Sequence, residues 1–83
     1  MRTMLLIGQS GNSIHPFPCH IDIERRCNPD TKNTYFVIIC DGEYVIAKYQ
    51  EMVPAKMEVA RLRGVWHDDP NATEFQFLKD VKE

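Results

Sequence analysis

The sequence predicts a small α+β domain, in which a mostly antiparallel sheet of about five or six strands is built around one hairpin. Residues 34–49 form two runs of β-branched and aromatic side chains around Asp41-Gly42, which is a strong hairpin pattern. Residues 54–63 consist largely of good helix formers and predict one short helix. An all-β, barrel-like fold is the alternative. At 83 residues, the chain is expected to be a single domain spanning 1–83.

The hairpin at 34–49 predicts its own register. Asp41-Gly42 suits a two-residue type I′ turn, which would place Cys40 opposite Glu43. Side chains then separate by parity into two faces. The face expected to meet the core carries Phe36, Ile38, Cys40, Val45, Ala47 and Tyr49, and the opposite face carries Tyr35, Val37, Ile39, Tyr44, Ile46 and Lys48. Because both faces are apolar, the second face should be covered or should contact a partner.

The segments before the hairpin predict further strands. Residues 2–7 are an apolar run ending at a glycine, which is typical of a strand followed by a loop. Residues 14–20 contain two prolines and are therefore expected to be an edge strand or a connector. Residues 20–24 alternate between apolar and acidic side chains, which predicts a half-buried strand. Residues 28–30 are Asn-Pro-Asp, a turn sequence.

The helix at 54–63 is expected to begin with Pro54 at its first position and to end at Gly64. Its apolar stripe would be Ala55, Val59 and Leu62, whereas a strand over the same residues gives a poorer pattern.

Residues 64–67 and 73–77 flank an Asp-Asp-Pro-Asn turn, so a final hairpin is predicted there. The alternative is a second helix starting at Asp69-Pro70, with Phe75, Leu78 and Val81 on one face.

Composition and charge exclude several classes of function. Ten basic and twelve acidic residues give a net charge of −2, too small for the field that drives non-specific nucleic-acid or membrane binding. Three cysteines cannot all pair within the chain, and no apolar signal segment precedes them. We therefore expect free thiols, a cytoplasmic location and no membrane association.

The sequence contains only weak candidates for a metal site or a catalytic residue. His15, Cys19, His20 and Cys27 are zinc-ligand types within a short stretch, but they contain no Cys-x-x-Cys pair, and Cys19 and His20 are adjacent. Cys19 beside a histidine could be a nucleophile, but nothing marks an oxyanion loop. The sequence therefore predicts no metal, no cofactor and no enzymatic activity.

The function that remains is a non-enzymatic protein-binding module acting on a protein partner or on a second copy of the chain. Such a chain suits a small inhibitor, adaptor or accessory factor, and its size suggests a phage or mobile-element origin. The expected contact residues are Tyr35, Val37, Ile39, Tyr44, Ile46 and Lys48, which mix aromatic anchors with a charged rim. The alternative is a single-stranded nucleic-acid binder that uses Lys56, Arg61, Arg63 and Trp66.

Overall fold

The chain folds as six strands and one helix in the computed structural model, which describes residues 2–80. In chain order the elements are β1 (Met4–Ile7), β2 (Ile14–Phe17), β3 (Ile21–Cys27), β4 (Thr34–Cys40), β5 (Tyr44–Tyr49), α1 (Met52–Asp68) and β6 (Glu74–Gln76). The α+β prediction is confirmed, and the all-β alternative is wrong because α1 forms. The strands make two three-stranded sheets, with orders β2-β1-β6 and β3-β4-β5, rather than one continuous sheet.

The predicted hairpin forms, but its register differs from the prediction. Asp41 and Gly42 both have positive φ, at 55° and 74°, and the Glu43 N–H donates to the Cys40 carbonyl at 3.2 Å. The turn chemistry is therefore as predicted. Cys40, however, lies opposite Tyr44 rather than Glu43, so the loop contains one more residue than a two-residue turn.

A bulge in β5 then shifts the register by one further residue, which restores the predicted alternation of faces beyond the bulge. Ile39 pairs with Val45 and Ile38 pairs with Ala47, which leaves Ile46 as the extra residue. The bulge turns Ile46 into the core and leaves Val45 exposed, so these two residues lie on the faces opposite to those predicted. Phe36, Ile38, Cys40, Ala47 and Tyr49 face the core as expected.

The helix is longer than predicted at both ends. It starts at Met52, which places Pro54 within the first turn, where its missing N–H costs nothing. It continues through Gly64 to Asp68, so the expected helix end at Gly64 and the expected strand at 64–67 are both wrong. The C-cap residue Asp69 is non-helical because Pro70 follows it and disfavours the α conformation.

The last strand forms within the predicted 73–77 segment, but its partner is different. β6 pairs with β1 in parallel, with Phe75 opposite Leu6, so the final hairpin with 64–67 is wrong. The alternative second helix is also wrong over the described residues, and Val81 lies outside them. Sheet β2-β1-β6 thus joins the two ends of the chain around β1, with the proline-containing β2 at one edge, as predicted.

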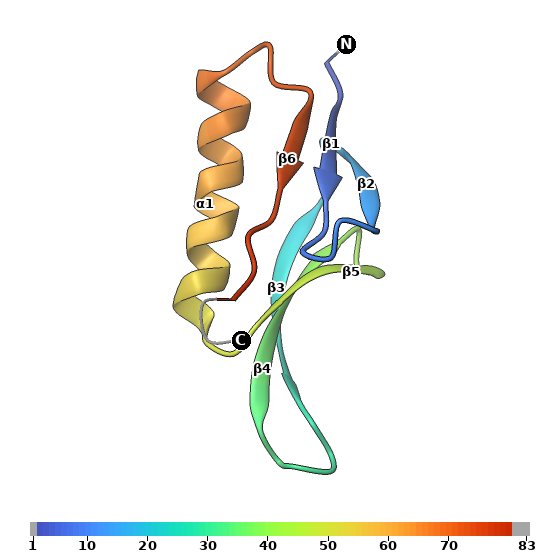
Figure 1. Cartoon of the computed structure of the whole chain (residues 1–83), viewed down its shortest axis with the longest axis vertical. Helices are drawn as coiled ribbons and strands as arrows, with labels where there is room; N and C mark the ends of the chain where they lie inside the picture. Colours follow the sequence, from blue (N-terminus) through green and yellow to red (C-terminus); the bar gives the residue numbers. More distant parts are fainter. Residues whose placement is uncertain (1, 81–83) are drawn as a thin grey trace.

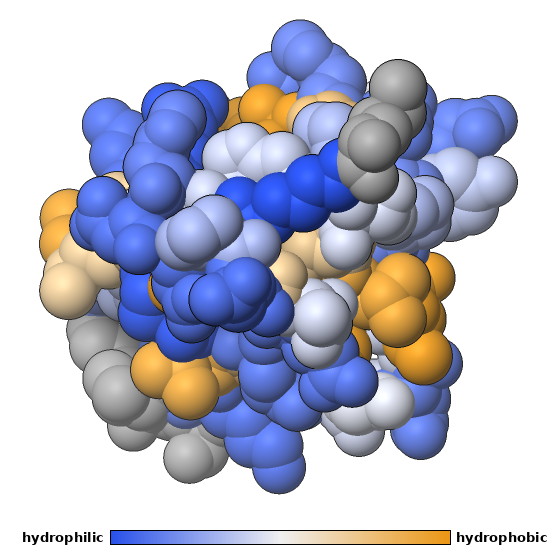
Figure 2. Space-filling model, turned by 90° about the horizontal axis from the view of Figure 1, so that it is seen from above, coloured by the Kyte–Doolittle hydropathy of each residue, from blue (hydrophilic) through white to orange (hydrophobic). Residues whose placement is uncertain are grey.

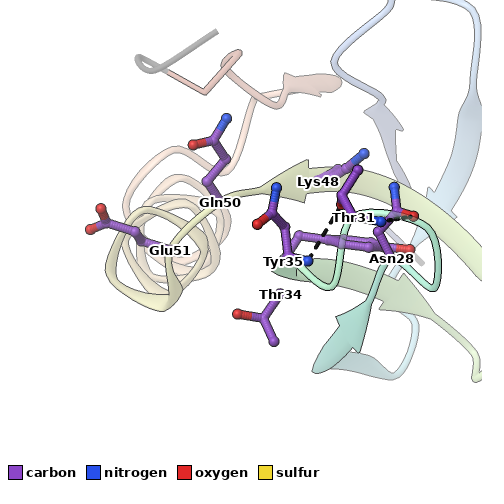
Figure 3. A pocket seen from close by; sticks show the side chains of 8 residues that line it. Asn28, Thr31, Thr34, Tyr35, Lys48, Gln50 and Glu51 are labelled. Atoms are coloured by element: carbon purple, nitrogen blue, oxygen red, sulfur yellow. Dashed lines mark hydrogen bonds between the residues drawn. The ribbon is translucent and has the colours of Figure 1, made fainter.

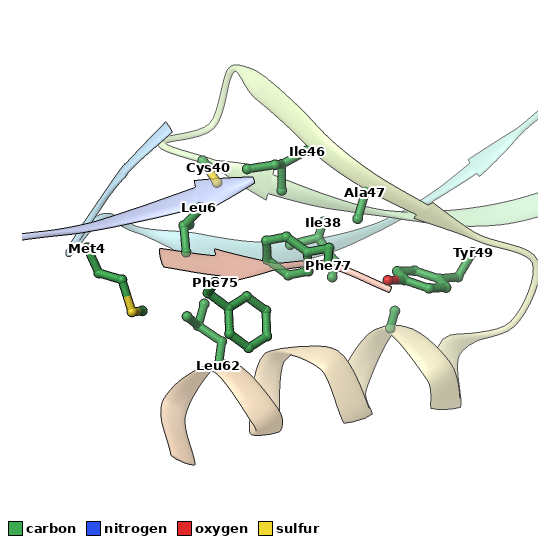
Figure 4. Close-up of a cluster of buried hydrophobic side chains, with 11 residues drawn as sticks. Met4, Leu6, Ile38, Cys40, Ile46, Ala47, Tyr49, Leu62, Phe75 and Phe77 are labelled. Carbon is green, nitrogen blue, oxygen red and sulfur yellow. The ribbon is translucent and has the colours of Figure 1, made fainter. Parts of the chain in front are cut away.

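The core lies between α1 and the strands of both sheets (Figure 4). Ala55 and Leu62 supply the helix side, with Val59 packed at its margin. The strand side is supplied by Met4, Leu6, Ile38, Cys40, Ile46, Ala47, Tyr49, Phe75 and Phe77. The two sheets approach closely at Gly8, where an added Cβ would lie 2.9 Å from the Ile46 carbonyl oxygen.

The molecule is elongated, at 44 × 23 × 20 Å. Figure 1 shows the cause: the β3–β4 hairpin extends well beyond the rest of the fold, away from β1, β2 and β6. The face in Figure 2 is mostly hydrophilic, and its apolar residues form separate islands rather than one continuous patch. No helix among residues 2–80 is both long and apolar enough to cross a membrane.

Candidate functional site

The two edges of sheet β3-β4-β5 differ, and the difference defines the candidate site. At the β5 edge, the Gln9 side chain acts as a short substitute strand. Its Nε2 donates to the Lys48 carbonyl at 3.0 Å, and its Oε1 accepts from the Lys48 N–H at 2.7 Å. At the opposite edge, β4 is the only described strand that pairs with β3, so the far side of β3 has no neighbouring strand. The β5 edge is thus partly closed, and the β3 edge is open.

The backbone groups exposed at the β3 edge follow from the register. The Asp41 N–H donates to the His20 carbonyl, and the Asn28 N–H donates to the Asn33 carbonyl, both at 2.8 Å. These two pairs fix which residues of β3 bond to β4, because hydrogen-bonded and non-hydrogen-bonded pairs alternate along an antiparallel ladder. The odd-numbered residues therefore direct their N–H and C=O groups away from β4: Ile21, Ile23, Arg25 and Cys27.

Helix α1 runs beside this edge and makes it a groove. A hollow of about 360 Å³ lies between them, lined by Ile21, Asp22 and Ile23 from β3 and by Lys56, Val59, Ala60 and Arg63 from α1. Ile21, Ile23 and Val59 also pack against the core, so the floor of the groove is apolar and anchored. Lys56 and Arg63 are seven residues apart, two turns of helix, and therefore share one helix face.

The charge of the groove is mainly basic. Lys56 and Arg63 lie on the helix side, and Arg25 lies two residues beyond Ile23 on the open edge. Asp22 is the one acidic residue among those that line the hollow. This local excess contrasts with the net charge of −2 of the whole chain. An occupant with acidic side chains is therefore favoured electrostatically.

The contact face expected from the sequence is largely closed. Ile46 lies in the core, and Val37 and Ile39 are only 2% and 3% exposed. Val37 lies opposite Glu24 on β3 and Lys48 on β5, and long charged side chains of this kind cover apolar neighbours with their stems. Tyr44 is 55% exposed, and Lys48 is also exposed.

Tyr35, the remaining member of that face, is half-buried at the base of the projecting hairpin. The Lys48 ammonium lies over its ring, 4.6 Å from the centroid. Both residues line a polar pocket with Asn28, Thr31, Asn33, Thr34, Gln50 and Glu51 (Figure 3). The cation–π contact engages both side chains within the chain itself.

Tyr44 instead belongs to a small apolar surface on the other side of the turn. It lines a shallow hollow with Ile14 and Val45, both of them exposed. The His15 ring packs against Tyr44 with centroids 5.1 Å apart. The bulge created this surface by turning Val45 outward, so sequence parity could not predict it.

The residues of the nucleic-acid alternative do not form one patch. Lys56 and Arg63 line the groove. Arg61 forms an ion pair with Glu58 at 2.8 Å and lies over the Phe75 ring. Trp66 packs edge-on against Phe17 and lies under Arg2. Its ring therefore contacts other side chains of the chain rather than standing free as a platform for bases.

The tertiary fold also brings together a group that sequence spacing did not reveal. Single ligand atoms of His15, Cys19 and Cys40 all lie within 4.8 Å of one another. The sequence places His20 and Cys27 near His15 and Cys19, but neither His20 nor Cys27 belongs to this group. Cys40 was missed because it is distant in sequence and was assigned to the apolar core.

Burial determines the protonation of the two thiols in this group. Burial, together with the neighbouring Cys19, raises the pKa of Cys40 to about 12. Burial also raises the pKa of Cys19, although the hydrogen bond with Cys40 lowers it in part. Both groups are therefore protonated thiols near neutral pH, which makes neither a ready nucleophile.

Comparison of the chain with protein-family models, curated proteins and solved structures found no match.

Proposed function

We propose that the protein is a non-enzymatic protein-binding module, which captures an extended acidic segment of a partner protein along the open edge of β3. The observation that carries this proposal is the unpaired β3 edge beside α1. An extended chain placed there would hydrogen-bond to the outward backbone groups of Ile21, Ile23 and Arg25 and add a strand to the sheet.

Side chains of the partner would alternate between two environments. Those directed toward the helix would meet the apolar floor of Ile21, Ile23 and Val59. Acidic side chains would lie near Lys56 and Arg63. Such a mode suits an inhibitor, adaptor or accessory factor, because backbone pairing supplies affinity while the groove supplies selectivity.

The test uses a blocked peptide of alternating valine and glutamate, matched in length to the seven residues of β3. A peptide with lysine in place of glutamate is the charge control. Binding is measured by fluorescence anisotropy of the labelled peptide. We expect the acidic peptide to bind at least about tenfold more tightly than the basic one.

Two substitutions of the exposed Arg25 distinguish the contribution of backbone hydrogen bonds to peptide binding from the contribution of the Arg25 charge. Arg25→Pro removes an outward N–H without removing a bond to β4, and proline is tolerated at such edge positions. It should weaken binding about tenfold or more, since it removes a donor and places a ring against the incoming strand. Arg25→Ala removes the charge but keeps the N–H, and should weaken binding only about threefold or less.

Equal binding by the two Arg25 variants, with both folded by circular dichroism, would exclude strand addition. Tighter binding of a single-stranded oligonucleotide than of the acidic peptide would favour the nucleic-acid alternative. Self-association of the chain that is lost with Arg25→Pro would identify a second copy as the occupant of the edge.

A further inference from the structure

The side chains of His15, Cys19 and Cys40 converge from three separate parts of the fold. His15 is on β2, Cys19 is in the connection between β2 and β3, and Cys40 ends β4. They therefore lie between the two sheets. Their ligand atoms lie within 4.8 Å of one another, and Cys40 is fully buried.

We propose that these three residues bind one zinc ion, which joins the two sheets. One imidazole and two thiolates are ligands that zinc prefers, and hard ions such as magnesium bind such a set poorly. Zinc–sulfur and zinc–nitrogen bonds of about 2.3 and 2.0 Å place tetrahedral ligands roughly 3.5–3.8 Å apart. Closing the group from 4.8 Å or less thus shortens each separation by about 1.3 Å at most.

The surroundings of His15 also suit a ligand. Its Nε2 lies 2.9 Å from the Asp41 carboxylate, and the other oxygen of that carboxylate accepts the His20 N–H at 3.0 Å. The carboxylate is thus held in place and fixes the orientation of the imidazole ring, as carboxylates do for histidine ligands of zinc. A water molecule would complete the tetrahedron, because both Asp41 oxygens already bond to His15 and His20. This site is independent of the β3 edge.

Binding must release protons in a defined number. Each thiol loses one proton when its sulfur bonds to zinc, so one Zn²⁺ replaces two protons and no electron is transferred. Proton release on adding zinc, followed with a pH indicator in weakly buffered reductant near neutral pH, reports this directly. The expected release is two protons for each zinc ion bound.

Affinity is measured by competing zinc against a chromophoric chelator. We expect one zinc per chain and no displacement of it by magnesium. Cys19→Ser should weaken zinc binding about a hundredfold or more, and His15→Ala about tenfold or more. Cys27→Ser and His20→Ala are the matched controls, and should leave affinity within about threefold because neither residue belongs to the group.

Three results would overturn the proposal. The first is no zinc binding at micromolar concentrations by the reduced, folded protein. The second is a loss of affinity in the Cys27 or His20 controls equal to that in the Cys19 variant. The third is zinc binding that releases no protons. Cobalt(II) absorption bands from sulfur-to-metal charge transfer, present in the wild type and absent in Cys19→Ser, would support it even if Cys40 variants fail to fold.

Discussion

Glu58 holds Leu78, which follows β6, against the helix, and replacing Glu58 should destabilise the fold measurably. Its carboxylate is buried on α1. It accepts the Leu78 N–H at 2.7 Å and two hydrogen bonds from the Arg61 guanidinium at 2.8 and 3.0 Å. Arg61 in turn donates to the Gln76 carbonyl, so the pair connects α1 to β6 and to the residues after it.

The magnitude follows from these contacts. Glu58→Ala removes a charged acceptor from the part-buried Leu78 N–H, a loss of about 1.5–3 kcal/mol. The Arg61 side chain is 39% exposed, so its ion pair adds only about 0.5 kcal/mol. The expected loss is therefore about 2–3.5 kcal/mol of unfolding free energy in urea. Glu58→Gln keeps an acceptor and should lose less, and the exposed control Glu43→Ala should stay within about 0.5 kcal/mol.

The pH dependence gives a second readout of the same contacts. Burial alone would raise the pKa of Glu58, but the hydrogen bonds from Arg61 and Leu78 outweigh burial and hold the pKa below its ordinary value of 4.5. The stabilisation is thus complete above pH 4.5 and is lost as the pH falls through the lower folded pKa. The stability difference between wild type and Glu58→Gln should shrink over that range. A Glu58→Ala variant as stable as wild type at neutral pH would refute this account.

The other predictions use the same urea assay. Gly42→Ala should lower the unfolding free energy by about 1 kcal/mol because Gly42 has a φ of +74°, whereas Gly64→Ala should raise it by up to about 1 kcal/mol because Gly64 lies within α1. Both sites have open space for a Cβ, so equal effects of the two substitutions would contradict the argument from backbone conformation. Leu62→Ala should cost about 2–5 kcal/mol and the exposed Met57→Ala less than about 0.5, and a reversed order would mean that the helix presents another face to the core. Zinc at a hundredfold excess over its Kd should stabilise the wild type by about 2.7 kcal/mol and Cys19→Ser far less; equal gains would place the ion elsewhere.

Local chemistry was enough to predict some of the fold. Asp41-Gly42 predicts positive φ at both positions because few residues other than Gly, Asn and Asp adopt it. The same turn did not determine the register, because the loop contains one more residue and β5 bulges at Ile46, beside the close approach of the two sheets at Gly8. Gly64 disfavours a helix by only about 1 kcal/mol, which is small beside the burial of neighbouring helix residues.

The candidate sites were harder to predict because each is formed by residues that are distant in sequence and meet only in the folded chain. Whether β3 is an edge depends on which strand pairs with it, and the parallel pairing of β1 with β6 gives no local sequence pattern. Cys40 joins His15 and Cys19 only once the two sheets pack together. Lys56 and Arg63 were identified as basic surface residues, but their position beside β3 requires the fold.

Amide hydrogen exchange at the β3 edge tests the central claim most directly. The amides of Ile23 and Arg25 face away from β4 and should exchange rapidly in the free protein, whereas the inward Glu24 amide should already be protected. Saturating the protein with the valine–glutamate peptide should slow exchange at Ile23 and Arg25 about tenfold or more. Protection confined to the Tyr44 and Val45 surface, with Ile23 and Arg25 unchanged, would contradict strand addition at β3.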